Sequence, residues 1–115
     1  MNNNTNKQNK YKNIKVALWN ANSVAGKMGE LTHFLYTHKI DIITLSETKL
    51  APDTPLTLRN YTIHRSDRTR RGGGVAILIK NSLPHIALPQ TNSNIEHISI
   101  KLWNGVVVTS CYLPP

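Results

Sequence analysis

Apolar residues along this chain fall into short runs separated by polar turns. The run Ile14 to Trp19 predicts a strand, and the nearly continuous apolar run Ile40 to Leu45 predicts a strand covered on both faces. Between these runs, Lys27 to His38 places apolar residues at helical spacing on one face, namely Met28, Leu31, Phe34 and Leu35. The order strand, helix, strand over this distance predicts a compact crossover unit.

The rest of the chain predicts a series of short strands. Lys49 to Asn60 contains two prolines and predicts a loop. Asn104-Gly105 is the strongest hairpin signal in the chain, so the last two strands should pair antiparallel. One helix is therefore followed mostly by antiparallel hairpins. The strands are expected at Tyr61 to His64, Val75 to Ile79, Pro84 to Leu88 (a weak candidate), Ile95 to Leu102 and Val106 to Tyr112.

Composition separates a polar leader from a single domain. Residues 1–13 are rich in Asn and Lys and have almost nothing to bury, so they predict a disordered basic leader, and residues 14–115 are expected to form the domain. The net charge of +8, with 14 Lys and Arg against 6 Asp and Glu, predicts attraction to polyanions, most often nucleic acid. That charge does not separate a nuclease from a passive binder, and part of it belongs to the leader.

The cysteine content and the apolar runs exclude several classes of protein. The single cysteine, Cys111, excludes an internal disulfide and a zinc cluster built on cysteines, and its apolar surroundings predict a buried, inert thiol in a reducing compartment. No apolar stretch is long enough to cross a membrane, and the polar N-terminus lacks the apolar core of a secretory signal. The five histidines are scattered, which favours structural or surface roles.

Polar residues stand at the ends of three predicted strands. In α/β folds, ligands collect at the carboxyl ends of strands, so an amide, a carboxylate and a phenol could converge there. The segments are Trp19-Asn20-Ala21-Asn22-Ser23, Leu45-Ser46-Glu47-Thr48 and Cys111-Tyr112-Leu113-Pro114-Pro115.

Glu47 is the sharpest candidate for chemistry. It sits at the mouth of a buried strand, where an unpaired carboxylate is costly. Mg²⁺ takes oxygen ligands and commonly uses one or two carboxylates. A surface glutamate that caps a loop or pairs with Lys49 fits the position equally well. The other two segments also have purely structural interpretations. The asparagines after Trp19 could simply form a turn, and Tyr112 could be a half-buried residue with a hydrated hydroxyl.

A basic loop from Arg65 to Arg71 runs into Gly72-Gly73-Gly74. Arginine binds phosphate oxygens in bidentate fashion, and glycines allow a tight turn and close approach of another backbone. The glycine spacing is not that of a nucleotide-binding P-loop. A solvated surface loop is the alternative, but the net charge favours DNA backbone contacts by Arg68, Arg70 and Arg71.

These segments, in this order and strand context, resemble the endonuclease/exonuclease/phosphatase superfamily. Within it, the likeness is to the apurinic-type endonuclease domain that opens the polyprotein of non-LTR (LINE-like) retrotransposons. It runs from about Ile14 to Pro115 and includes the glycine-led strand from Gly72 to Ile79. The resemblance implies an α/β (α+β) fold, a four-layered DNase-I-like sandwich of which this chain is about the N-terminal half. That half would hold one mainly antiparallel sheet and one outer helix, and it would expose an apolar sheet face that promotes self-association.

The resemblance also implies roles for single residues. Glu47 would bind Mg²⁺ (or Mn²⁺), so the resemblance favours a metal ligand over a surface glutamate at this position. Asn20 would position the scissile phosphate or a catalytic side chain, and Tyr112 would bind the phosphate and stabilise charge in the transition state. Asn22 matches a position that is Asp in some repair-type relatives, so its amide oxygen would be a further metal ligand. Ser23 replaces the glycine of many members. The catalytic set expected from the resemblance is thus Asn20, Glu47 and Tyr112.

The function implied is Mg²⁺-dependent hydrolysis of a DNA phosphodiester, a nick whose 3′ hydroxyl primes reverse transcription at the target site. The partners would be DNA and the rest of the same polyprotein, namely the second half of the domain and the reverse transcriptase, with no membrane partner and a nuclear or cytoplasmic location. The family also uses an Asp-x-Asn pair and an Asp-His pair beyond Tyr112, which this chain lacks, so the chain alone is expected to be inactive. The alternatives are an abasic-site repair endonuclease, another phosphoesterase of the superfamily, and a non-catalytic nucleic-acid-binding remnant.

Overall fold

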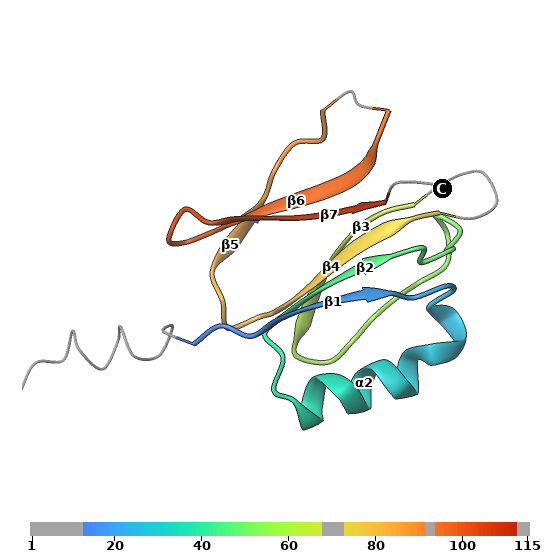
Figure 1. Ribbon diagram of the computed structural model, residues 1–115, viewed down its shortest axis with the longest axis horizontal. Coiled ribbons are helices and arrows are strands. Elements are labelled where there is room, and N and C mark those ends of the chain that lie inside the picture. The colour runs from blue at the N-terminus through green and yellow to red at the C-terminus, as the bar shows by residue number, and fades with distance from the viewer. Residues whose placement is uncertain (1–12, 68–72, 92–93, 113–115) are drawn as a thin grey trace, which may run out of the picture.

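The computed structural model describes residues 13–67, 73–91 and 94–112, and this part of the chain forms one α-helix and seven strands (Figure 1). Every element expected from the apolar pattern is present, with ends that match or shift by at most two residues. Of the expected leader, all but Asn13 lies outside the described residues. The elements are β1 (Val16–Asn20), the 3-10 turn η1 (Ala25–Lys27), α2 (Met28–Thr37), β2 (Ile42–Ser46), β3 (Tyr61–Ser66), β4 (Val75–Lys80), β5 (His85–Ala87), β6 (Glu96–Leu102) and β7 (Val107–Tyr112).

The strands divide into two sheets. The first sheet has the order β1-β2-β4-β3, and the second has the order β5-β6-β7. β1 and β2 are parallel, with Val16 opposite Ile42, so the predicted strand–helix–strand crossover is confirmed. All other pairs are antiparallel. The expected mixed α/β class, with a mainly antiparallel sheet and one outer helix, is therefore confirmed, and a smaller antiparallel sheet accompanies it.

The elements stack in three layers. Figure 1 shows α2 below the first sheet and β5, β6 and β7 above it. The central strands β2 and β4 are therefore buried on both faces, which explains their continuous apolar sequences. The core between helix and sheet contains Ala21, Val24, Leu31, Leu35, Ile40, Ile43, Leu45, Leu50, Ala76 and Leu78. The core between the two sheets contains Ile42, Val75, Ile77, Ile79, Leu83, Ile98, Ile100 and Leu102.

The second core explains why β6 and β7 form a separate sheet. Ile98, Ile100 and Leu102 alternate on one face of β6, and that face packs on the inner residues of β2 and β4. A hairpin that joined the edge of the first sheet would leave one apolar face in water. The turn between β6 and β7 is the predicted one: Gly105 has φ +90°, and its amide donates to the Leu102 carbonyl at 2.9 Å.

β7 corrects the expectation for Cys111. Its side chains alternate, so that Ser110 is buried while Cys111 is exposed. The thiol therefore lies on the outer face of the second sheet. An apolar run in sequence did not mean burial here, because only one face of the smaller sheet is covered.

Edge strand β1 keeps an uncovered apolar face. Val16 and Leu18 share the face of Ile42, which lies between the sheets, but Leu18 is 85% exposed and Val16 is 56% exposed. The expected exposure of apolar side chains on a sheet face is confirmed at these two positions. Within the described ranges, no helix is long and apolar enough to span a membrane.

Candidate active site

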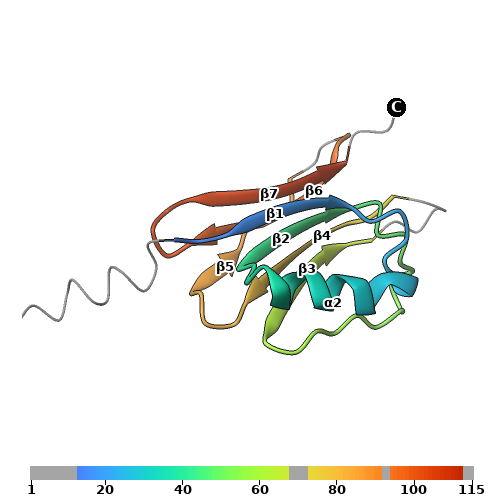
Figure 2. The same ribbon diagram turned by 60° about the horizontal axis from the view of Figure 1, so that its bottom comes forward.

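Three strands bring their carboxyl ends to one end of the molecule. β1 and β2 are parallel neighbours, with Asn20 opposite Ser46 at their last pair. β7 packs against β2 from the second sheet and ends at Tyr112, and in Figures 1 and 2 the arrowheads of β1 and β7 point to the same side. The Ser110 hydroxyl of β7 donates a buried hydrogen bond of 2.8 Å to the Leu45 carbonyl of β2. This bond fixes the end of the second sheet over the end of the first.

A bulge presents Glu47. Up to Ser46, β2 pairs with β4 in regular antiparallel register, with Ser46 opposite Val75. Beyond that point the Thr48 amide donates to the Gly74 carbonyl at 3.1 Å, which leaves one extra residue on the β2 side. The extra residue is Glu47, with φ +52°. Bulges re-aim side chains, and left-handed non-glycine residues concentrate at functional sites.

Glu47 lies within a set of donors and positive charge. The hydrogen bond donated by the Tyr112 hydroxyl is the main cause that lowers the pKa of the Glu47 carboxyl below its usual value. Burial acts in the opposite direction, while a hydrogen bond from Asn20 and the charge of Lys49 lower the pKa further. The carboxyl group is thus ionised at neutral pH, and because it is only half-buried it remains accessible to a ligand.

Two lysines hold the loop after β1. The Asn20 side-chain oxygen accepts the Asn22 amide at 3.2 Å, which leaves the Asn20 NH₂ group as the donor to Glu47. The Asn22 side-chain oxygen accepts a hydrogen bond from Lys49 Nζ at 2.7 Å. Lys27 Nζ donates to two backbone carbonyls of the same loop, at 2.6 and 3.2 Å. These contacts place two positive charges beside the strand ends, an arrangement suited to an anionic ligand.

The glycine turn before β4 braces the other side of the bulge. Gly74 has φ +93°, and a Cβ atom there would overlap the Thr48 hydroxyl. Glycine at this position therefore makes room for the side chain of Thr48. The Gly74 amide donates to the Glu96 carboxylate of β6, so this turn is held from the second sheet as well.

The structure thus brings together part of the residue set expected from sequence. Asn20, Glu47 and Tyr112 form one hydrogen-bonded group. Asn22 lies in the adjoining loop, with its side-chain oxygen bonded to lysine. The basic loop residues Arg68, Arg70 and Arg71 lie outside the described residues, so their DNA contacts stay a prediction.

Sequence reasoning missed Lys27 and Glu96 near this group, and it named Lys49 only as an alternative partner of Glu47. Lys27 lies in the 3-10 turn and Lys49 in a loop, and only the folded backbone shows that both reach the loop after β1. The sequence did contain a sign of Glu96, because this acidic residue lies two positions before Ile98 and so on the same inward face of β6.

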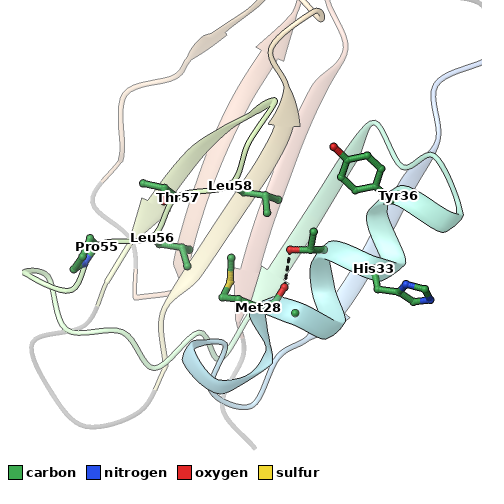
Figure 3. A pocket seen from close by; sticks show the side chains of 9 residues that line it. Met28, His33, Tyr36, Pro55, Leu56, Thr57 and Leu58 are labelled. Carbon is green, nitrogen blue, oxygen red and sulfur yellow. Dashed lines mark hydrogen bonds between the residues drawn. The ribbon is translucent and has the colours of Figure 1, made fainter.

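An open hollow lies elsewhere, between α2 and residues 55–58 (Figure 3). It is an open depression of about 720 Å³, and the Thr32 hydroxyl donates to the Met28 carbonyl at 2.7 Å on its wall. Its ionisable groups are His33 and Tyr36, with no carboxylate. This hollow therefore lacks the acidic group that metal chemistry needs.

Comparisons with known proteins agree with this geometry. A family model described as the endonuclease/exonuclease/phosphatase family matches residues 17–112. The RNA-directed DNA polymerase from mobile element jockey of Drosophila melanogaster is 33% identical over 110 residues, which covers 89% of this chain and 12% of that protein. A probable RNA-directed DNA polymerase from transposon X-element of the same fly is 38% identical over 78 residues, 65% of this chain and 9% of that protein. The chain thus spans about a tenth of the length of these curated relatives.

Two solved structures share the fold. A 3′ phosphatase from Neisseria, bound to a product DNA hairpin, superposes with a TM-score of 0.68 at 23% identity, over 87% of this chain and 41% of that one. An AP endonuclease from Archaeoglobus fulgidus gives a TM-score of 0.68 at 21% identity, over 89% of this chain and 42% of that one. The resemblance read from the strand-end segments is confirmed by the family match and by the mobile-element relatives. The chain belongs to the endonuclease/exonuclease/phosphatase family.

Proposed function

We propose that this chain is the N-terminal part of a Mg²⁺-dependent DNA endonuclease that nicks target DNA to prime reverse transcription during retrotransposition. The observation that carries the proposal is the convergence of Asn20, Glu47 and Tyr112 at three strand ends. The relatives named as RNA-directed DNA polymerases from mobile elements support the retrotransposon setting. The net charge of +8 supports a polyanionic substrate.

The residues present fit a divalent cation. Glu47 is an ionised, half-buried carboxylate, and a site for Mg²⁺ commonly combines one or two carboxylates with water and substrate phosphate. Among residues 13–67, 73–91 and 94–112 no group of three or more His, Cys, Asp or Glu side chains could hold a metal ion. Glu47 would therefore be the principal protein ligand, and the Asn22 oxygen, which accepts a hydrogen bond from Lys49 Nζ, would be a second one. A bound Mg²⁺ would supply Lewis-acid stabilisation of charge on the phosphate.

The chain's own residues would bind and orient the scissile phosphate. The Tyr112 hydroxyl and the Asn20 NH₂ group now donate to Glu47, and both could turn to a phosphate oxygen at the same place. Fixed donors of this kind stabilise developing negative charge without reorganisation. Lys49 and Lys27 add positive charge beside them. Arg68, Arg70 and Arg71 would contact the DNA backbone farther from the bond that breaks.

The water-activating groups would come from sequence beyond Tyr112. The resemblance places an Asp-x-Asn pair and an Asp-His pair there, and the solved neighbours are more than twice as long as the part that this chain matches. The isolated chain is thus proposed to bind metal and DNA without cleaving, and the rest of the polyprotein is proposed as its partner. Action on DNA implies a nuclear site of action.

A nicking assay tests the proposal. Supercoiled plasmid is incubated with Mg²⁺ and either the purified 115-residue chain or a longer product of the same reading frame. We expect no nicking by the chain alone and Mg²⁺-dependent nicking by the longer protein, reduced about a thousandfold by Glu47→Gln because a metal ligand is lost. Robust nicking by the chain alone, or a longer protein indifferent to Glu47→Gln, would contradict it. Preference for abasic over intact duplex would assign the site to repair instead.

A further inference from the structure

Glu96 is an acidic residue at an inward position of β6. It shares the face of Ile98 and Ile100, which belong to the core between the sheets. It also lies directly opposite Tyr112 in the β6–β7 ladder. A carboxylate on such a face is costly unless it is bonded, and one of its oxygens is shielded from solvent. The position therefore calls for a specific polar contact.

That contact is the glycine turn of the other sheet. The Gly74 amide donates to Glu96 Oε1. The Gly74 carbonyl in turn accepts the Thr48 amide at 3.1 Å, and the Gly73 carbonyl accepts the Lys49 amide at 2.8 Å. The two amides held in this way directly follow Glu47 in the chain. A continuous path of hydrogen bonds thus leads from Glu96 to the bulge.

The path has little room to shift. Gly74 is buried, and Thr48 is 1% exposed with its hydroxyl against Gly74. Close packing transmits a displacement of one group to its neighbours rather than absorbing it. If the Gly73–Gly74 turn moved, the backbone after Glu47 would have to move with it.

We propose that Glu96 is a positioning residue, which holds the Gly73–Gly74 turn from the second sheet and thereby fixes Glu47 in front of Tyr112. The Glu96 side chain holds the backbone next to Glu47 through Gly74. The Glu96 backbone holds Tyr112 through the β6–β7 ladder. The inference deepens the proposed function, because the group that it places is the proposed metal ligand. It assigns no direct contact with metal or DNA to Glu96.

Amide hydrogen exchange and Mn²⁺ titration of the full 115-residue chain test this role. In Glu96→Ala we expect the exchange rates of the Thr48 and Lys49 amides to rise about fivefold relative to wild type, the factor typical of one lost hydrogen bond. We expect the affinity for Mn²⁺, read from broadening of signals around Glu47, to fall about tenfold, as when a partner of a metal ligand is removed.

The conservative variant separates positioning from a general loss of stability. Glu96→Gln keeps an oxygen that can accept the Gly74 amide, so both readouts should stay within about twofold of wild type. Glu96→Asp shortens the side chain by one methylene and should behave like Glu96→Ala. It provides the same test if the alanine variant does not fold. Glu30→Ala, at an exposed acid on α2, is the matched control and should change neither readout.

Unchanged exchange in both Glu96→Ala and Glu96→Asp would overturn the proposal, as would a Glu96→Gln variant as impaired as alanine. Failure of the proposed function gives a different result. Wild type would then show no Mn²⁺ effect at Glu47, while the exchange rates would still report whether Glu96 holds the turn.

Discussion

The hydroxyl of Ser110 in β7 donates a buried hydrogen bond of 2.8 Å to the carbonyl of Leu45 in β2. Ser110 lies two positions before Tyr112, and Leu45 lies two positions before Glu47. Both bonded residues are therefore close in sequence to a member of the candidate site. The bond joins the two sheets next to their shared end. The pairing of Tyr112 with Glu47 therefore depends on the stacking of the sheets.

Ser110→Ala tests this link. The substitution removes the donor and should lower the free energy of unfolding by about 1 kcal/mol, the usual net worth of one hydrogen bond. Ser99→Ala is the control, because the Ser99 hydroxyl pairs with Thr109 at 2.7 Å in an exposed setting and should cost less than about 0.5 kcal/mol. Denaturant unfolding measures both. An equal loss in the free energy of unfolding for both variants would mean that the inter-sheet hydrogen bond stabilises the protein no more than an exposed one does.

Tyr112→Phe should raise the pKa of Glu47 towards its ordinary value, because the hydrogen bond that lowers it most is lost. The folded-state pKa of Glu47 lies below its unfolded value of 4.5, so its stabilising contribution is present above that pH and is lost as pH falls through the folded pKa. The variant should therefore lose less stability on acidification. Carboxyl ¹³C NMR titration gives the pKa directly. Tyr61→Phe, whose hydroxyl donates to the Ile40 carbonyl, should leave it unchanged.

Two glycine substitutions should have opposite signs. Gly74→Ala should destabilise the protein by at least about 1 kcal/mol, because φ is +93° and the new Cβ atom would overlap Thr48. Gly29→Ala lies within α2 with open space around it, and should stabilise by about 0.5–1 kcal/mol through helix propensity. Thermal or chemical unfolding measures the change in stability of each variant. A tolerated Gly74→Ala would show that the turn does not need glycine.

A histidine pair between the sheets should make stability depend on pH. His64 of β3 and His85 of β5 meet at 2.8 Å between their Nε2 atoms, and His85 Nδ1 donates to the Leu83 carbonyl. Burial, and then the charge of His85, lower the pKa of His64. Its stabilising contribution is therefore present above the unfolded value of 6.5 and is lost as pH falls through the lower folded pKa.

Unfolding at pH 7.5 and at acidic pH tests this dependence. Wild type should lose more stability on acidification than His64→Phe, which cannot titrate, whereas His33→Gln on the exposed face of α2 should retain the wild-type slope. Identical slopes in wild type and His64→Phe would contradict the assignment.

The uncovered face of β1 should drive self-association. Leu18→Lys replaces a side chain that is 85% exposed, so it should leave stability within about 0.5 kcal/mol while it reduces association at high concentration. Leu78→Ala, at a fully buried core position, should cost about 2–5 kcal/mol. Sedimentation velocity reports the association. A wild-type chain that stays monomeric at high concentration would contradict the first expectation.

The apolar pattern predicted the elements well because β2, β4 and α2 each bury most of one or two faces. Periodicity identifies which residues share a face, but not which element will cover that face. For that reason the separate second sheet was not foreseen, and Cys111 was placed in the core although the alternation of β7 turns it outward. The burial of one face of a strand depends on partners that are distant in sequence.

The candidate site divides in the same way. Asn20, Glu47 and Tyr112 could be found because the carboxyl ends of strands gather ligands, whatever their separation along the chain. The bulge at Glu47 could not be found, since a left-handed glutamate has no sequence signature. The contact between Glu96 and Gly74 joins residues from different sheets, and only the assembled fold shows it.

Mn²⁺-induced broadening of backbone amide signals in the purified chain tests whether these strand ends bind a divalent cation. Substoichiometric Mn²⁺ should broaden signals centred on Asn20, Glu47 and Tyr112, excess Mg²⁺ should restore them, and Glu47→Gln should abolish the effect. Broadening centred elsewhere, or unchanged in Glu47→Gln, would contradict the assignment of these strand ends as the metal site.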